Sequence, residues 1–168
     1  MRFDLLVPSG GNLDRICQLF RSVVQQTILP ERIVVVLDKP RDQDEIEHFL
    51  YSLHKTLGKA ASRLVLVHHR NSDFEAEQGV GYVRKYLLSQ ATSSYVYMID
   101  DDNVFDETFF EQTGKIYQEI VGKIGTECVL SPTILLRKTG QVQSQGILGF
   151  ASYLFPKYRF QQLTDQPW

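Results

Sequence analysis

The run Ile33-Val34-Val35-Val36-Leu37 constrains the fold of this chain more than any other feature. An uninterrupted, mostly β-branched apolar run is typical of a strand that is covered on both faces, as in a parallel sheet between layers of helices. Parallel neighbours need crossover connections, which are usually helical. The segments on either side of this run should therefore alternate between strands and helices.

The residues up to about position 125 follow that alternation. Short apolar segments predict strands at residues 2–7, 33–37, 64–67 and 95–99, and amphipathic spacing predicts a helix after each of them. We therefore predict an α/β fold, a three-layer sandwich with a mainly parallel central sheet.

The expected helix ends can be placed from capping residues. Asn12 should cap the first helix, Asp42 or Asp44 the second, and Gly58 should end the second. The third helix should begin near residue 81 and the fourth near residue 106.

After Gly125 the pattern changes to short strands. Residues 128–130 predict a strand, and residues 133–144 predict a β-hairpin. The last twenty residues are rich in aromatic side chains without clear periodicity. Such a segment would expose a large apolar patch, so we expect it to pack on a further C-terminal segment or on a second copy in a homo-oligomer.

Charge and composition exclude several classes of protein. The 168 residues hold 18 Lys and Arg against 20 Asp and Glu, which argues against a nucleic-acid partner. The chain has neither an apolar run of the ~20 residues that a membrane helix needs nor a visible secretory signal. Cys17 and Cys128 lack metal-ligand spacing and fall in apolar patterns, so we expect reduced core thiols. We therefore expect one cytoplasmic domain.

Three features stand at predicted strand ends. They are the segment Pro8-Ser9-Gly10-Gly11, Asp38, and the run Asp100-Asp101-Asp102. In an open parallel sheet, ligands bind beyond the carboxyl ends of the strands, and the predicted topology brings these features to that edge. This edge is therefore the candidate binding site.

The run of three aspartates suggests a cation site. Two carboxylates ~4 Å apart repel each other by ~4 kcal/mol at an effective dielectric constant of about 20, a cost that a cation offsets. On an extended segment Asp100 and Asp102 would face the same way while Asp101 turns aside. Oxygen ligands alone favour Mg²⁺ or Mn²⁺. The alternative is a solvated strand exit whose aspartates cap the next turn.

Two further residues have both a binding and a structural interpretation. Asp38 precedes Lys39-Pro40, as is common in turns, but its place at the ligand edge favours binding. The segment Gly79 to Arg84 opens the third helix at the ligand edge, where we expect Arg84 to reach a phosphate, to pair with an aspartate, or to face solvent. The glycines after Ser9 would let a nucleotide approach closely, but they match neither a P-loop nor Gly-x-Gly-x-x-Gly.

Several segments in order resemble family 2 glycosyltransferases of the GT-A fold, over roughly residues 2–110. The segments are Leu6-Val7-Pro8, Val23 to Thr27, Ile33 to Asp38, Gly79 to Arg84 and Val96 to Asp102. The resemblance implies a Rossmann-like domain. Residues up to about 125 would bind a nucleotide sugar, and residues 126–168 would begin the acceptor side.

The resemblance also implies roles at the nucleoside. Asp38 would hydrogen-bond the base, while Pro8 and Ser9 would lie beside the base and ribose. The chain departs from the family here, because Gly10-Gly11 replaces the usual Tyr-Asn and Lys39-Pro40 replaces Gly-Ser.

At the diphosphate, the aspartates would stand at the family's Asp-x-Asp motif. Asp102 would be the main ligand of Mn²⁺ or Mg²⁺, with Asp100 or Asp101 toward ribose or metal. The implied reaction moves a sugar from a UDP- or GDP-linked donor to a hydroxyl of a glycan, lipid or small-molecule acceptor, with inversion. The cation would stabilise charge on the departing nucleoside diphosphate.

No catalytic base is identified. The family's base is an Asp or Glu well downstream of Asp-x-Asp, but beyond Glu127 the only acidic residue is Asp165, which lies in no matching motif. Two other functions stay open. One is a domain that binds a nucleotide sugar or a partner without turnover. The other is a metal-dependent nucleotidyltransferase, although only Arg15 supplies a basic residue near the first glycine pair.

Overall fold

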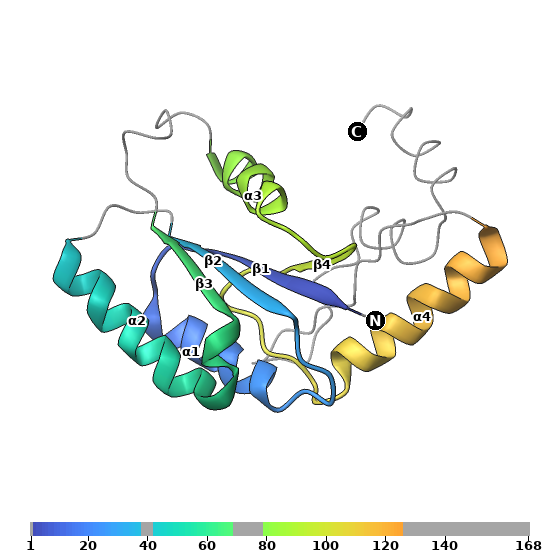
Figure 1. Ribbon diagram of the computed structural model, residues 1–168, viewed down its shortest axis with the longest axis horizontal. Helices are drawn as coiled ribbons and strands as arrows, with labels where there is room; N and C mark the ends of the chain where they lie inside the picture. The colour runs from blue at the N-terminus through green and yellow to red at the C-terminus, as the bar shows by residue number, and fades with distance from the viewer. Residues whose placement is uncertain (1, 38–41, 69–78, 126–168) are drawn as a thin grey trace, which may run out of the picture. The chain divides into compact units, whose positions relative to one another are not determined.

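The structure is a computed structural model in which residues 2–37, 42–68 and 79–125 are described. The first half contains β1 (Phe3–Ser9), α1 (Leu13–Val24), β2 (Arg32–Leu37) and α2 (Gln43–Leu57). A 3₁₀ turn, η1 (Gly58–Arg63), leads to β3 (Leu64–His68), α3 (Gly79–Ser89), β4 (Tyr95–Met98) and α4 (Phe109–Ile124). The predicted alternation of strands and helices is confirmed over these residues (Figure 1).

The chain divides into two compact units, Met1–Phe110 and Glu111–Trp168. The first unit contains the whole sheet and every described residue of the candidate site. In the second unit, the described part of α4 carries ion pairs one turn apart, Glu111 with Lys115 at 2.6 Å and Glu119 with Lys123 at 2.5 Å. Within the described ranges, no helix is long and apolar enough to cross a membrane.

The sheet has the order β3-β2-β1-β4, and all three strand pairs are parallel. Leu5 lies in register with Ile33 and Tyr97, and Ser9 with Leu37. The predicted mainly parallel sheet is therefore confirmed for its described part. The hairpin predicted at residues 133–144 lies outside the described residues.

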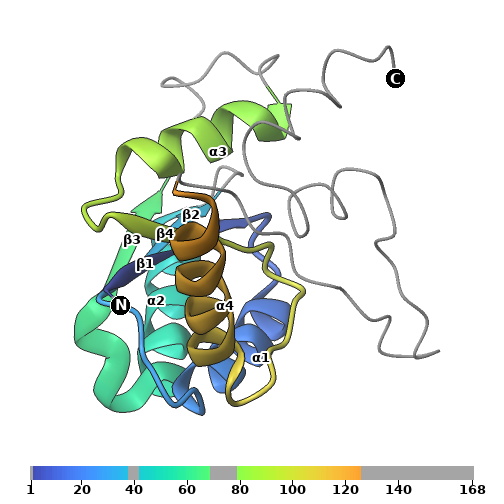
Figure 2. The same cartoon turned by 90° about the vertical axis from the view of Figure 1, so that its right-hand side faces the viewer.

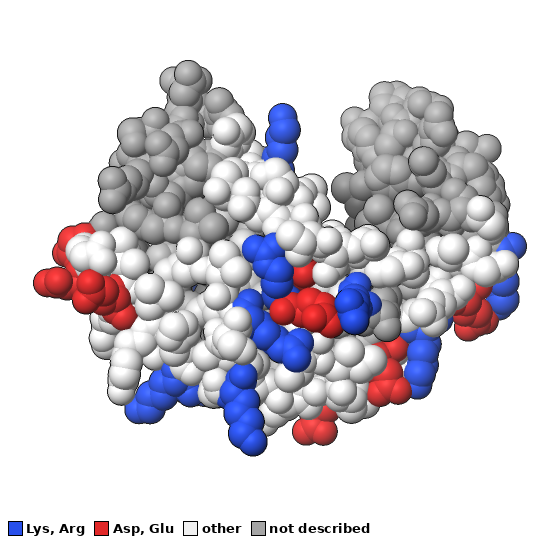
Figure 3. Space-filling view, viewed as in Figure 1, with Lys and Arg blue, Asp and Glu red and all other residues white. Residues whose placement is uncertain are grey.

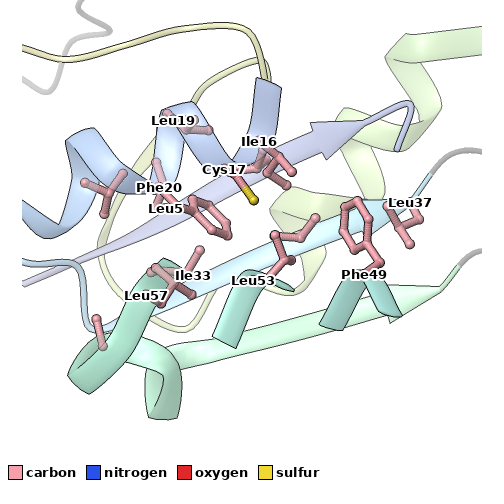
Figure 4. Packing of buried hydrophobic residues seen from close by; sticks show 14 of the residues in the cluster. Leu5, Ile16, Cys17, Leu19, Phe20, Ile33, Leu37, Phe49, Leu53 and Leu57 are labelled. Carbon is pink, nitrogen blue, oxygen red and sulfur yellow. The ribbon is translucent and has the colours of Figure 1, made fainter. Parts of the chain in front are cut away.

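Helices cover both faces of the sheet, as Figures 1 and 2 show with α1 and α2 on one side and α3 on the other. The larger core lies between the sheet and the α1–α2 pair. Figure 4 shows side chains of α1 and α2, among them Phe20 and Leu53, converging on Leu5 and Ile33. Each such fully buried side chain stabilises the fold by ~1.5–3 kcal/mol.

The smaller core lies under α3. Leu6, Val34 and Val36 point to this face and pack with Val83 and Leu87. Both faces of β2 are thus buried, which confirms the interpretation of its unbroken apolar sequence. The predicted three-layer sandwich is the observed one.

The helix ends follow their capping residues. The Asn12 side chain accepts from the backbone N–H of Arg15 at 3.1 Å, and Asp42, not Asp44, accepts from that of Glu45 at 2.7 Å. Gly58 ends α2 with φ of 54°, a left-handed conformation that favours glycine.

The predicted start of the fourth helix is wrong. α3 begins at Gly79, the first residue of the segment that was expected to open it, but α4 begins at Phe109 and not near residue 106. The physical reason is that residues 105–107 are hydrogen-bonded to α1 and to the residues just after it.

The predicted core thiol is confirmed for Cys17, which is buried and lies 3.4 Å from the Thr56 hydroxyl oxygen. Cys128 lies outside the described residues.

The surface charges are mixed in sign. On the face seen in Figure 3, described Lys and Arg side chains are interspersed with Asp and Glu. An extended patch of one sign, which nucleic-acid binding favours, is not seen among the described residues of that face.

Candidate functional site

The three aspartates follow β4 in a turn at the carboxyl edge of the sheet. The Ile99 N–H still donates to the Leu6 carbonyl at 3.0 Å, so pairing with β1 continues one residue past β4. The chain then turns at Asp101 and Asp102, and the Asn103 N–H donates back to the Asp100 carbonyl at 3.3 Å. The backbone is therefore a closed turn and not an extended segment.

Asp101 contacts the end of the central strand. The Ser9 hydroxyl donates to its Oδ2 at 2.5 Å, although the two residues are 92 positions apart. The same hydroxyl oxygen accepts from the Gly11 N–H at 3.0 Å. The structure thus brings together the aspartate run and the Ser9-Gly10-Gly11 segment, as the topology predicted.

Asp100 contacts α3. An Nη atom of Arg84 lies 2.9 Å from Asp100 Oδ1 and 3.2 Å from its Oδ2. Of the alternatives left open for Arg84, pairing with an aspartate is the arrangement observed.

Asp102 contacts α1, which covers the other face of the sheet. Its Oδ2 lies 4.0 Å from an Nη atom of Arg15 in the first turn of α1, and its Oδ1 accepts from the Asn103 amide at 3.4 Å. Since α1 and α3 cover opposite faces, Asp100 and Asp102 have partners on opposite sides of the strand end. The expectation that these two side chains face the same way is therefore wrong, because it assumed an extended backbone.

The three carboxylates differ in exposure. The side chains of Asp100 and Asp102 are 53% and 58% exposed, and their arginine partners are also substantially exposed. Asp101 is only half-buried but less accessible than either neighbour. Because solvent screens exposed ion pairs, a ligand can displace either arginine at little cost.

The donor set suits a cation that is shared with a phosphate group. Carboxylate oxygens are ligands for Mg²⁺ and Mn²⁺, and Mg²⁺ commonly uses one or two carboxylates together with waters and substrate phosphates. Asp102 offers such an exposed carboxylate. The described residues contain no cluster of three or more His, Cys, Asp or Glu that could enclose a metal.

Pro8 is buried beside the site, at the point where the ladder between β1 and the chain that follows β4 ends. The backbone groups of alternate residues in a strand point to the same neighbouring strand, so the nitrogen of Pro8, like that of Leu6, faces the β4 side. The last bond of this ladder runs from the Ile99 N–H to the Leu6 carbonyl, and proline, which has no N–H, does not continue it. Asp38 follows Leu37, the register partner of Ser9, but itself lies outside the described residues.

Sequence reasoning missed two contacts of the aspartate run. Arg15 and Asn103 both contact Asp102, and neither was proposed as a site residue. The position of Arg15 could have indicated this contact, because the first turn of a helix that follows β1 lies at the ligand edge.

Comparison with known proteins agrees with this geometry. The sequence profile described as "Glycosyl transferase family 2" matches residues 4–120. Among curated proteins there is no significant match.

The fold is similar to solved structures of S. aureus TarS. The chain matches TarS 1–349 in complex with UDP at 20% identity and a TM-score of 0.59, covering 86% of this chain and 39% of that one. The complex with UDP-GlcNAc gives 21% identity and a TM-score of 0.60, covering 86% and 38%. The chain thus spans about two fifths of the length of these structures, and at this identity the likeness shows the fold.

The family match extends over more than half of the chain and contains β1 from Asp4 onward, the Ser9 turn, Arg84 and the aspartate run. The chain belongs to glycosyl transferase family 2.

Proposed function

We propose that the carboxyl edge of the sheet binds the nucleoside diphosphate part of a nucleotide sugar. The observation that carries the proposal is the contact of Asp101 with Ser9, which holds the aspartate run against the end of β1. A nucleotide can lie across this edge, with its nucleoside near the β1 turn and its phosphates near the aspartates. TarS, of similar fold, has been crystallised with UDP and with UDP-GlcNAc, which supports this class of ligand.

In this proposal Asp102 is the main ligand of a divalent cation, Mn²⁺ or Mg²⁺, that also binds the diphosphate, and Asp100, whose partner in the free chain lies on the opposite side, turns toward the cation when the ligand binds. Arg84 leaves Asp100 and turns to a phosphate oxygen, which is possible because their ion pair is solvent-exposed. Pro8 and Ser9 lie beside the base and ribose, and Asp38 hydrogen-bonds the base. When bound, the cation supplies Lewis-acid stabilisation of the leaving diphosphate.

The proposed reaction is sugar transfer with inversion. The oxygen of an acceptor hydroxyl forms a bond to the anomeric carbon while the bond from that carbon to the diphosphate oxygen breaks. The hydroxyl proton passes to a base. We assign no residue to that role, and the acceptor is a hydroxyl of a glycan, a lipid or a small molecule.

Thermal unfolding with UDP or GDP, with and without Mn²⁺, tests donor binding. A ligand at one hundred times its dissociation constant adds ~2.7 kcal/mol, which for a domain of this size raises Tm by about 5–10 °C. We expect Asp102→Asn to remove the Mn²⁺-dependent part of the shift. Asp44→Asn, an exposed aspartate in the first turn of α2, is the matched control and should keep it. If neither nucleotide raises Tm under any condition, the proposal is wrong.

Binding without turnover is the second candidate function. It needs only the edge of the sheet at which Ser9, Arg84 and the aspartate run meet, and no residue that acts as a base. Release of UDP from UDP-sugars in the presence of mixed acceptors separates the two functions. A protein that binds UDP-sugars but releases no UDP would be a binding domain.

A further inference from the structure

The hydrogen bond between Ser9 and Asp101 links two segments that come from distant parts of the sequence. Ser9 is the last residue of β1, is buried, and lies in register with Leu37. Its hydroxyl donates to Asp101 Oδ2 at 2.5 Å. A hydroxyl has a single proton to donate, so this bond fixes the direction of the O–H.

The same hydroxyl also determines the turn that follows β1. Its oxygen accepts from the Gly11 N–H at 3.0 Å, a local bond that closes a tight turn two residues on. Gly11 has φ of 81°, in the left-handed region, and the next residue, Asn12, caps α1. One oxygen atom thus connects the carboxylate of Asp101 to the turn and to the start of α1.

Asp101 differs from its two neighbours in what it contacts. Asp100 and Asp102 are exposed and face arginines that can move away. Asp101 is half-buried and bonded to a buried hydroxyl whose position is set by the sheet. Because solvent screens the two exposed ion pairs, while the Ser9 hydroxyl is buried, the contact of Asp101 is the more persistent of the three.

We infer that Ser9 and Asp101 are a positioning pair, which couples the nucleoside side of the proposed site to its cation and phosphate side. Asp101 then holds the turn of the aspartate run in place and does not ligate the cation, a task left to Asp100 and Asp102. This inference rests on the proposed function for its ligands, but the coupling between the two segments is a property of the chain alone.

The coupling can be measured without any ligand by hydrogen–deuterium exchange of the full chain. Asp101→Ala should raise the exchange rate of the amides at residues 10–12, which are far away in sequence, because Ser9 loses its acceptor. Ser9→Ala should likewise raise exchange at residues 100–103. Asp44→Ala and Ser62→Ala, both at exposed positions away from this edge, are matched controls and should change neither region. Unchanged exchange at residues 10–12 in Asp101→Ala would overturn the pairing, whether or not the protein binds nucleotides.

Binding measurements then test the consequence for ligands. Calorimetry compares UDP with and without Mn²⁺, and uridine serves as the probe of the nucleoside side alone. Coupling between sites commonly changes affinity ~5- to 150-fold, and we expect Ser9→Ala to lower the Mn²⁺-dependent gain in UDP affinity about tenfold. Ser9→Thr keeps the hydroxyl and should restore most of it, and the uridine titration measures the part of the Ser9→Ala loss that comes from the place of Ser9 beside the nucleoside.

A double-mutant cycle distinguishes positioning from direct ligation. If the residues act as a pair, Ser9→Ala combined with Asp101→Asn should be no worse than either single change. If Asp101→Asn instead abolishes Mn²⁺ binding as Asp102→Asn does, Asp101 is a ligand and the inference is wrong. If the wild-type protein binds no UDP at all, the proposed function fails, and the exchange experiment still decides the pairing.

Discussion

Gln26 holds the segment that follows the aspartate run through its contact with Asp106. Its side-chain amide donates to the Asp106 carbonyl at 2.5 Å, and its Oε1 accepts from the Phe110 N–H at 3.2 Å. The amide also donates to the Ser22 carbonyl at 3.1 Å, and Gln26 is only 7% exposed. One buried side chain thus fixes both ends of the turn that leads into α4.

We predict that Gln26→Ala destabilises the fold by about 2–3 kcal/mol, because it removes the hydrogen bonds of this buried side chain to the buried Phe110 N–H and to the partly buried Asp106 carbonyl. Chemical denaturation measures the loss. Gln43→Ala is a matched control, since Gln43 is exposed and its side-chain amide donates to Glu47 on the surface of α2, and it should stay within about 0.5 kcal/mol of wild type. Equal effects of the two changes would contradict the proposed role of Gln26.

Asp4 should make stability depend on pH in the acid range. It is fully buried in β1, where burial by itself would raise its pKa. Hydrogen bonds from the backbone and side chains of Thr92 and Ser93, at 2.7 to 3.2 Å, outweigh burial and hold the pKa below its ordinary value of 3.8. The folded protein therefore binds this proton more weakly than the unfolded chain does.

The direction of the pH dependence of stability follows from that difference in proton affinity. The stabilisation by Asp4 is fully present above the unfolded pKa and is lost as pH falls through the lower, folded value. We expect Asp4→Asn to be clearly destabilising at pH 7 and the gap to wild type to narrow between about pH 4 and pH 2. Denaturation curves across this range, with Asp44→Asn as control, measure the gap. If the difference in the free energy of unfolding between Asp4→Asn and wild type does not change with pH, the charge of Asp4 makes no contribution to stability.

The layered fold could be predicted because its signals are local. The apolar sequence of β2, the caps at Asn12 and Asp42, and Gly58 each determine structure within a few residues, and all four indications agree with the structure. The meeting of Ser9 with the aspartate run was predictable too, since parallel strands bring their carboxyl ends to one edge.

Contacts that depend on a side chain reaching across the fold could not be predicted. The start of α4 was misplaced because nothing local in the sequence shows that the Gln26 side chain bonds Asp106 and Phe110, which are 80 and 84 positions away. The predicted common orientation of the Asp100 and Asp102 side chains was wrong, because the turn at Asp101 depends on Ser9 and Arg84, which are distant in sequence. In both cases a tertiary contact overrides the local geometry.

Phe110 should be among the most sensitive apolar positions near β4. Its ring lies 4.8 Å from that of Phe3, 4.9 Å from that of Tyr97 and 5.0 Å from that of Phe105, and it is 1% exposed. We predict a loss of about 3–5 kcal/mol for Phe110→Ala, since the cavity cannot collapse against three other rings. Its neighbour Phe109 is only partly buried, so Phe109→Ala should cost clearly less in the same denaturation experiment. The reverse order would show that the ring cluster is not packed as described.

Arg84 should affect ligand binding far more than stability. Its pair with Asp100 is solvent-exposed, so Arg84→Ala should change the free energy of unfolding by less than about 1 kcal/mol. Removing this cation leaves the aspartate run more negative, so the affinity for Mn²⁺ alone should rise. The affinity for UDP in the presence of Mn²⁺ should fall, because the proposed site loses a phosphate contact.

Opposite changes in the two affinities are the distinctive result. A residue that merely supports the fold would lower both, and a solvent-facing arginine would change neither. Lys85→Ala provides the matched control, because Lys85 is the next residue of α3 and is exposed, so it removes the same charge without touching Asp100. Calorimetric titration of both variants with Mn²⁺ and then with UDP makes the comparison. A fall in Mn²⁺ affinity in Arg84→Ala would contradict the proposal that Arg84 exchanges Asp100 for a phosphate oxygen.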